Sequence, residues 1–375
     1  MDRRFWREFN LPLLICVLVL LGLGMLSVYS AMLNAVTGEG VPLRTLFPRH
    51  VINMGVGIIL MLGAMLVDYR LLSSLTRPLY IIVIVVLGVV LIVGRISEGA
   101  QSWIEVGSRT IQPSEPAKLI MILVLAAYWA HFEAQRTTWG VQFGGLLLMA
   151  IPILLVLIQP DFGTAMVFGS IWLAMAWSAG LRWPQLLGLA VLTLPLLLVG
   201  WYYVFDPEQR SRFSTFYYLI VNPAQVDPNE GYNVIQSLNA ISSGGWFGAG
   251  LTHGALSQGN YVPVQYSDFI FAVIGEELGF VGGVVILIFQ GLLLWQVLSI
   301  ANRAYDLFGR LVAIGVFGMM LCHLVVNVGM TMSITPVTGI PLPFISYGGS
   351  FMLTSLVTIG LLESVAMRWR RISFA

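Results

Sequence analysis

The chain has 375 residues, of which 58% are hydrophobic and 10% charged, whereas soluble domains average about 45–50% and about 25%. Its mean hydropathy is +0.86, and its 19 basic and 18 acidic residues leave no basic surface for nucleic acid. Cys16 and Cys322 both lie in apolar runs, which excludes a disulfide framework and a cysteine-based zinc site. These features predict a polytopic membrane protein.

Ten apolar segments are predicted to be membrane-spanning helices, because about 20 apolar residues cross about 30 Å of hydrocarbon. In chain order they are 11–32, 50–67, 78–95, 114–131, 141–158, 161–180, 184–205, 268–299, 310–334 and 349–367. The first segment is too long for the apolar core of a cleavable signal peptide. We therefore expect an all-α fold in which 1–375 form a single integral membrane domain.

The charges between these segments predict the orientation. Ten crossings put both termini on one side, where the termini and the connecting loops hold 12 basic and 6 acidic residues. The opposite side holds 7 basic and 12 acidic residues. Because basic residues favour the cytoplasmic side, both termini are predicted to be cytoplasmic.

The outward side carries one large loop, residues 206–267, which is far longer than its neighbours. Loops of this length are usually functional or disordered, and the aromatic residues in this one argue against disorder. The shorter outward pieces 96–113, 158–161 and 335–348 contain glycine and proline, which indicates turns.

Polar residues at membrane depth suggest a functional site. Glu115 and Lys118 stand three apart at the start of a predicted helix, so they can pair on one face. Lys118 is the single lysine of the chain, and a compact ammonium suits a phosphate group. The alternative is a structural ion pair between helices.

Two aspartates stand at predicted helix starts. Asp161 follows Pro160, where a carboxylate can either cap the helix or bind a ligand. Asp268 is expected at the mouth of an aqueous cleft, where it can act as a general base; the alternative is again a helix cap. Glu276 and Glu277 lie about 80° and about 180° around the helix from Asp268, so the three acids cannot line one cavity.

The stretch 341–350 combines prolines with Gly348 and Gly349 before a predicted helix. Free N–H groups at such a helix start can bind an anion. The four histidines, His50, His131, His253 and His323, lie in different segments without metal-ligand spacing, so we treat them as solitary residues.

Five ordered stretches together resemble the SEDS family (shape, elongation, division and sporulation). They are Gly99–Ile104, Gln112–Lys118, Gln159–Thr164, Asp268–Gly279 and Pro341–Ser350. The first of them, and Gly231–Ser237 in the large loop, are more similar to the RodA branch than to the FtsW branch. Tyr266-Ser267 stands where the family commonly has His-Thr.

The resemblance implies a peptidoglycan glycosyltransferase that polymerises lipid II during cell elongation, on the outer face of the bacterial cytoplasmic membrane. It implies Asp268 as the catalytic residue and Glu115 and Lys118 as motif residues. The residues expected to bind substrate are Glu115, Lys118, Arg109, Trp103, Gln112, Asp161, Arg210, Ser346, Tyr347, Gly348 and Gly349. It also implies a divalent cation, Mg or Mn, with unknown ligands.

The partners that the resemblance implies are a class B penicillin-binding protein, which supplies the transpeptidase, and other membrane proteins of the elongation complex. The substrates are lipid II and the nascent glycan on its undecaprenyl carrier. Because the donor bond is α and the polymer bond is β, the reaction inverts, and one base on the acceptor hydroxyl suffices.

Three alternatives are a lipid II flippase or transporter, a division polymerase of the FtsW type, and a non-catalytic scaffold. Transporter sites lie near the midplane between repeated broken helices, whereas the candidate residues here gather on one side. The sequence therefore favours an enzyme.

Overall fold

The computed structural model describes residues 9–36, 42–97, 100–106, 109–203, 207–222 and 225–368. A helix occupies each of the ten apolar segments, within a few residues of the predicted bounds. These helices are α2 (Leu11–Leu33), α3 (Phe47–Leu66), α5 (Thr76–Val93), α6 (Ser114–His131), α7 (Trp139–Ile158), α8 (Phe162–Ser178), α9 (Trp183–Tyr203), α13 (Ile270–Arg303), α14 (Leu307–Thr331) and α15 (Gly349–Met367). Short helices fill several connections: η1 (Leu43–Leu46), α4 (Tyr69–Leu72), η2 (Ser73–Leu75) and η3 (Glu133–Gln135).

Within the described residues, seven helical stretches are long and apolar enough to cross a membrane. They comprise α2, η1 with α3, α4 through α5, α7, α13, α14 and α15, and two shorter apolar helices lie at Phe162–Ser178 and Trp183–Thr193. The prediction of a helical protein with several membrane-spanning segments is thus confirmed, and the full count of ten crossings remains a prediction.

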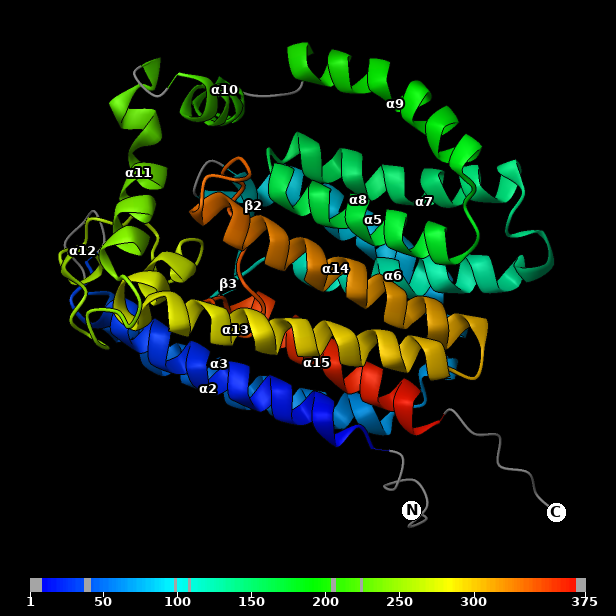
Figure 1. Cartoon of the computed structure of the whole chain (residues 1–375). Coiled ribbons are helices and arrows are strands. Elements are labelled where there is room, and N and C mark those ends of the chain that lie inside the picture. The colour runs from blue at the N-terminus through cyan, green and yellow to red at the C-terminus, as the bar shows by residue number, and fades with distance from the viewer. Residues whose placement is uncertain are drawn as a thin grey trace.

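The helices lie side by side as a bundle, with both chain ends at the same end of it (Figure 1). Helix α14 lies inside and packs against α6, α8 and α13, while α3 packs along α15. The outer faces expose large apolar side chains, such as Ile59 (69% exposed), Ile92 (82%) and Val191 (72%). Such a surface is stable where it faces lipid hydrocarbon.

The expectation of an all-α fold is wrong in one place, because the segment 96–113 contains a small sheet in place of turns. Strands β1 (Arg95–Ser97), β2 (Ala100–Val106) and β3 (Arg109–Ile111) pair antiparallel in the order β1-β2-β3. Ile104 pairs with Ile111 in the second ladder. Polar and apolar residues alternate only over Ile104–Val106 of β2, which is too short a pattern to predict a strand.

The segment 206–267 is largely helical. It contains α10 (Pro207–Val221), α11 (Pro228–Ser243) and α12 (Ala255–Gln258), which lie at the end of the bundle away from the chain termini (Figure 1). Helix α11 begins with Asp227, whose side chain accepts from the Asn229 N–H, followed by Pro228 in the first turn, the usual signals of a helix start.

Helix α13 is broken at Gly279, whereas the sequence predicted one continuous helix. Gly279 has φ +66°, and a side chain there would run into the backbone of Phe247 and Gly248. The turn 244–250 fills the break: the N–H groups of Phe280 and Val281 donate to the carbonyls of Gly245 and Trp246, at 2.9 and 3.1 Å. At the break, these hydrogen bonds join the turn 244–250 of the 206–267 segment to α13.

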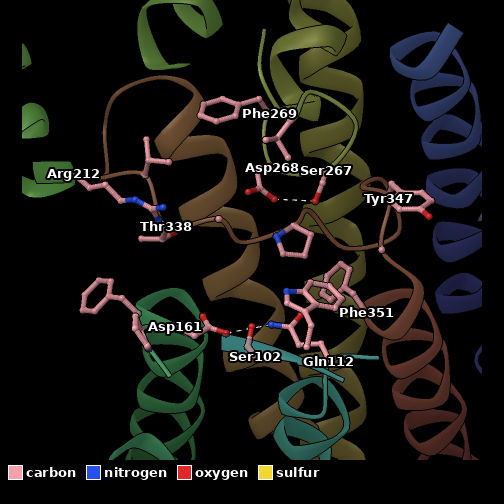
Figure 2. A pocket seen from close by; sticks show the side chains of 18 of the residues that line it. Ser102, Gln112, Asp161, Arg212, Ser267, Asp268, Phe269, Thr338, Tyr347 and Phe351 are labelled. Atoms are coloured by element: carbon pink, nitrogen blue, oxygen red, sulfur yellow. Dashed lines mark hydrogen bonds between the residues drawn. The ribbon is translucent and has the colours of Figure 1, made fainter. Parts of the chain in front are cut away.

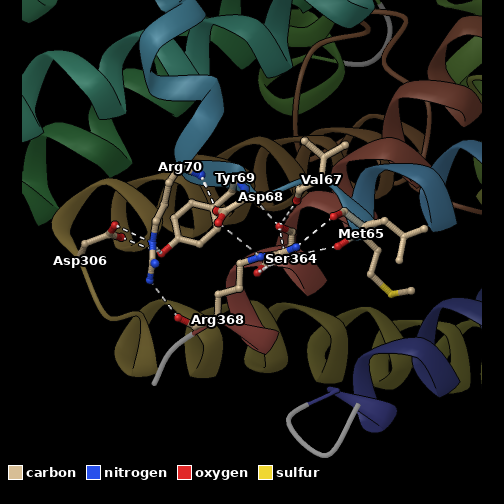
Figure 3. Close-up of polar contacts among 9 residues, drawn as sticks. Met65, Val67, Asp68, Tyr69, Arg70, Asp306, Ser364 and Arg368 are labelled. Carbon is tan, nitrogen blue, oxygen red and sulfur yellow. Dashed lines mark hydrogen bonds and ion pairs between the residues drawn. The ribbon is translucent and has the colours of Figure 1, made fainter. Parts of the chain in front are cut away.

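A polar network closes the opposite end of the bundle, near the chain termini (Figure 3). Asp306 caps α14 through the Gly309 N–H (2.9 Å) and accepts from the Tyr69 hydroxyl (3.0 Å). Arg368 donates to the Ser364 hydroxyl (2.6 Å) and to the Leu66 carbonyl (3.0 Å). The α3–α4 turn, the start of α14 and the end of α15 are thereby linked.

Candidate active site

One cavity of about 370 Å³ draws residues from every motif stretch, at the end of the bundle away from the termini. Its walls come from β2, the starts of α8 and α15, helix α10, and the connections 264–269 and 337–341 (Figure 2). Of the predicted site residues, it contains Asp268, Trp103, Gln112, Asp161, Tyr347, Gly348 and Gly349. Residues far apart in sequence thus share one solvent-accessible space.

Asp268 lies on the cavity wall and is 9% exposed. The Ser267 hydroxyl donates to its Oδ1 at 2.8 Å (Figure 2). Helix α13 starts only at Ile270, with Phe269 as its N-cap and no capping side chain. Asp268 is therefore not the cap of this helix, and the alternative interpretation of a simple cap does not fit the structure.

The backbone around Asp268 is held by three consecutive hydrogen bonds. The carbonyls of residues 266–268 accept, in order, from the Tyr347 N–H (2.9 Å), the Ser346 hydroxyl (2.7 Å) and the Asn327 side-chain amide (2.9 Å). Asn327 also donates to the Ile340 carbonyl at 2.7 Å. These bonds lock the Asp268 turn against the 337–347 connection, so Ser346 positions the turn from below the cavity surface.

Gly339 lies directly beside the Asp268 carboxylate. It has φ +71°, a conformation that side chains rarely adopt, and a Cβ built on it would stand 3.2 Å from Asp268 Oδ2. Glycine is thus required here both by the backbone conformation and by the space that the carboxylate occupies.

Asp161 caps its helix and also lines the cavity, so the cap is confirmed and the ligand role stays a prediction. Its carboxylate caps α8, accepting from the Thr164 N–H (2.9 Å) and hydroxyl (2.8 Å). It also accepts from the Gln112 side-chain amide at 3.2 Å and lines the cavity (Figure 2). The cap fixes the orientation in which the carboxylate meets the cavity.

Glu115 and Lys118 form a buried ion pair beneath the cavity wall. The Lys118 Nζ lies 2.8 Å from Glu115 Oε1 and 3.2 Å from His323 Nε2, and all three residues are at most 3% exposed. His323 Nδ1 lies 3.0 Å from the carbonyl of Pro341, which lines the cavity. Because a carbonyl only accepts, Nδ1 carries the proton and Nε2 accepts from Lys118.

His323 was missed because it was treated as solitary. A usable signal was its spacing of four from Asn327 on a buried helix, which places both side chains on one face. Through Pro341 and Ile340 these two residues reach the same connection from α14. Lys118 is therefore connected to the cavity wall through His323 and Pro341.

The start of α15 faces the cavity with Gly348, Gly349 and Ser350. This helix has no side-chain cap, so its first N–H groups and its dipole favour an anion in the cavity. Tyr347 lines the cavity beside them, and burial raises the pKa of its hydroxyl above the ordinary value.

The arginine that lines the cavity is not one of those predicted from the sequence, Arg109 and Arg210. Arg210 donates to the Tyr202 carbonyl at 2.8 Å and is not among the residues that line the cavity. Arg212, two residues further along α10, lines it and points into it (Figure 2). Arg109 belongs to β3, and its side chain lies outside the described part of the structure.

Glu276 and Glu277 are not among the residues that line the cavity, which agrees with the prediction that the three acids cannot line one cavity. Glu276 accepts from the N–H groups of Leu256 (2.7 Å) and Ser257 (2.8 Å) at the start of α12. Glu277 accepts from the Ser30 hydroxyl at 2.7 Å. Because α13 starts at Ile270, the helical angle from Asp268 does not apply, although its conclusion holds.

The described residues contain no group of three His, Cys, Asp or Glu side chains placed to hold a metal ion. Asp161 and Asp268 nevertheless line one cavity. Mg²⁺ is commonly bound by one or two carboxylates together with substrate phosphates. The donor set therefore fits a cation that arrives with a phosphorylated substrate.

Related sequences match this chain along nearly its whole length. Residues 11–371 match the cell cycle protein family of FtsW, RodA and SpoVE. Peptidoglycan glycosyltransferase RodA of Treponema pallidum is 34% identical, with 96% of this chain and 98% of the relative covered. Stage V sporulation protein E of Bacillus subtilis is 36% identical, with 95% and 96% covered.

A solved structure shares the fold. The chain matches a structure described as "Structural coordination of polymerization and crosslinking by a peptidoglycan synthase complex" with a TM-score of 0.77 and 30% identity, over 96% of this chain and 97% of the other. The match of sequence and fold along the full chain leads to one conclusion: this protein is a member of the FtsW/RodA/SpoVE cell cycle protein family.

Proposed function

We propose that this protein is a peptidoglycan glycosyltransferase that polymerises lipid II, with Asp268 as its general base. The observation that carries the proposal is the cavity in which Asp268 faces the uncapped start of α15 and Arg212. A base and anion-binding groups in one space are what transfer of a sugar from a diphosphate requires. The curated relative with this activity supports it.

In the proposed reaction, the Asp268 carboxylate accepts the proton of the acceptor sugar's hydroxyl. The hydroxyl oxygen bonds to the anomeric carbon of the donor, on the face opposite the diphosphate. The bond from that carbon to the diphosphate oxygen breaks, and the polyprenyl diphosphate leaves with the electron pair. Its negative charge is stabilised by Arg212, by the N–H groups at Gly348–Gly349, and by the field of the buried Lys118.

We also propose a divalent cation, Mg²⁺ or Mn²⁺, held by Asp161 with the substrate diphosphate. When bound, it would neutralise charge on the leaving group. Asp161 is oriented for this by its own helix cap and by Gln112. Chelation should abolish polymerisation, and addition of Mg²⁺ or Mn²⁺ should restore it; full activity after chelation would contradict this part of the proposal.

The proposed setting is the bacterial cytoplasmic membrane, with ten crossings, both termini in the cytoplasm and the Asp268 cavity facing outward. The charge distribution between the two sides supports this orientation. We place the protein in cell elongation, as the likeness to RodA favours. Depletion in a rod-shaped cell distinguishes the roles: rounding indicates elongation, and filaments indicate division.

A lipid II flippase is the competing function. Purified protein, alone and with its partner, is incubated in detergent with labelled lipid II to detect polymer. In a second assay it is placed in vesicles with a lipid II analogue whose position in the inner or outer leaflet can be measured. Glycan ladders establish the polymerase, whereas movement across the bilayer without polymer establishes the flippase.

We propose a class B penicillin-binding protein as the partner, because the similar solved structure is described as a peptidoglycan synthase complex. The surface for it includes the exposed Trp246 (69%) and Phe247 (81%) beside the α13 break. Trp246→Ala and Tyr232→Ala should reduce partner-stimulated polymerisation more than basal polymerisation. Equal losses in both conditions would mean that the segment 206–267 serves substrate alone.

A further inference from the structure

A second cavity, of about 590 Å³, lies at the end of the bundle near the chain termini. It opens between α5, α6, α7 and the start of α14, and no SEDS-like motif stretch contributes to its wall. We call it the basal cavity. The charged and aromatic residues used in the argument below are Arg70, Arg77, Tyr80, Tyr128, His131 and Phe308, which all line it. The glycosyl transfer proposed above makes no use of it.

The basal cavity has an excess of basic residues. Among the residues that the structure describes, its lining contains two arginines and a histidine but one acidic residue, Asp306. The Asp306 carboxylate already accepts from the Gly309 N–H (2.9 Å) and the Tyr69 hydroxyl (3.0 Å), and lies 3.7 Å from Arg70 Nε. The Asp306 carboxylate is thus bonded within the network of Figure 3. The exposed Arg77 adds a positive charge that Asp306 does not balance.

Much of the remaining wall of the basal cavity is apolar. Val124, Leu148 and Phe308 line it. The Tyr80 and Tyr128 hydroxyls donate to the α7 carbonyls of Leu148 and Val141, both at 3.1 Å. These bonds tie α5 and α6 to α7 along the cavity wall.

The apolar wall leads to a surface suited to lipid. Beyond Arg77, α5 exposes Ile81 (62%), Ile82 (51%) and Val85 (57%). A ligand with its headgroup in the basal cavity could therefore extend an acyl chain along α5 without leaving hydrocarbon. A small soluble anion would use the arginines but not this surface.

We propose that the basal cavity binds an anionic phospholipid, with its phosphate at Arg77, beside the Arg70–Asp306 pair, and its chains along α5. Basic pockets between membrane helices are known to hold such headgroups. A lipid there would rest on the turn that links α3, α4 and α5 and on the start of α14, and so would stabilise the folded bundle by binding to it alone.

The experiment uses the full chain, purified in neutral detergent and stripped of lipid. Its thermal unfolding midpoint is followed against increasing dioctanoyl phosphatidylglycerol, with dioctanoyl phosphatidylcholine and inorganic phosphate as the comparison ligands. We expect a saturable rise with phosphatidylglycerol alone. An equal rise with phosphatidylcholine, or with inorganic phosphate, would overturn the proposal of an anionic lipid.

The matched variants are Arg77→Gln and Arg182→Gln, since Arg182 is an exposed arginine at the same end that does not line the basal cavity. Arg77→Gln should weaken phosphatidylglycerol binding about fivefold, the factor that corresponds to ~1 kcal/mol per basic residue. Arg182→Gln should leave it unchanged. Equal binding by the two variants would overturn the site. If Arg77→Gln does not fold, the comparison of phosphatidylglycerol with phosphatidylcholine on the unaltered chain still tests the proposal.

Discussion

The two ends of the helix bundle hold their carboxylates differently. Near the chain termini, Asp306 caps α14, accepts from the Tyr69 hydroxyl and pairs with Arg70 (Figure 3). At the other end, Asp268 stands outside its helix, and its turn is held by backbone carbonyls while its carboxylate faces a cavity (Figure 2). The Asp306 carboxylate is thus bonded within the framework of helices, whereas the Asp268 carboxylate lines the cavity.

Backbone geometry makes this difference. Asp306 directly precedes α14, so the N–H groups of that helix lie within its reach. Asp268 is separated from α13 by Phe269, and the bonds from Tyr347, Ser346 and Asn327 hold the residues around it. The main chain around Asp268 is thus fixed by neighbouring segments, and its carboxylate lies on the cavity wall with the Ser267 hydroxyl bonded to Oδ1.

The largest expected effect is the contrast between Asp268→Asn and Asp306→Asn. Asp268→Asn should reduce lipid II polymerisation by about 10²–10⁴, the usual contribution of a general base, with an unchanged unfolding midpoint. Asp306→Asn should keep its activity per folded molecule and lower the free energy of unfolding by less than about 1 kcal/mol, because asparagine caps a helix about as well as aspartate and the lost pair with Arg70 is partly exposed. Polymer yield and thermal unfolding are measured on both. If Asp268→Asn kept an activity within a few-fold of that of the unaltered chain, Asp268 would not be the general base.

The buried ion pair gives the next test. Lys118→Met should abolish polymerisation, and because it leaves the Glu115 carboxylate buried and unpaired it should also cost about 3–5 kcal/mol of stability. The double variant Lys118→Met with Glu115→Gln should regain much of that stability but no activity. A double variant that regains both would show that the pair serves the fold alone and that the ammonium has no part in the reaction.

Gly339 tests how closely the carboxylate must be placed. Gly339→Ala puts a methyl group 3.2 Å from Asp268 Oδ2, and displacement of a catalytic group by about 1 Å can cost about 10²-fold in rate. Gly250→Ala is the matched control, since Gly250 also has positive φ (+97°) but its Cβ would meet nothing closer than 3.8 Å. Both variants share the backbone strain. Equal rates in the two would mean that strain, and not the carboxylate, is what matters.

The smallest effect is expected at the neighbouring arginines of α10. Arg212→Gln should lower polymerisation several-fold, because Arg212 lines the cavity. Arg210→Gln should have little effect, because the Arg210 guanidinium donates to the Tyr202 carbonyl. Initial rates at several lipid II concentrations measure this. The opposite order would support the expectation from sequence, which chose Arg210.

Much of the helical framework was predictable from the sequence, because apolar run length and the positions of charges depend on local composition. The ten helices lie within a few residues of their predicted bounds. Asp268, Asp161 and Gln112 could be chosen because a polar residue in an apolar environment is conspicuous. The small sheet was missed because its alternation is short and lies between glycines that favour turns.

The tertiary structure alone decided which of these residues share a space. Arg210 and Arg212 are two residues apart on α10, so their side chains point in directions about 200° apart. Which of the two lines the cavity depends on how α10 packs, and the sequence does not contain that information. The same holds for His323, which meets Lys118 from a helix that follows 205 residues later. Local composition determines where the chain is helical, whereas the partners of a buried charge depend on how the helices pack against one another.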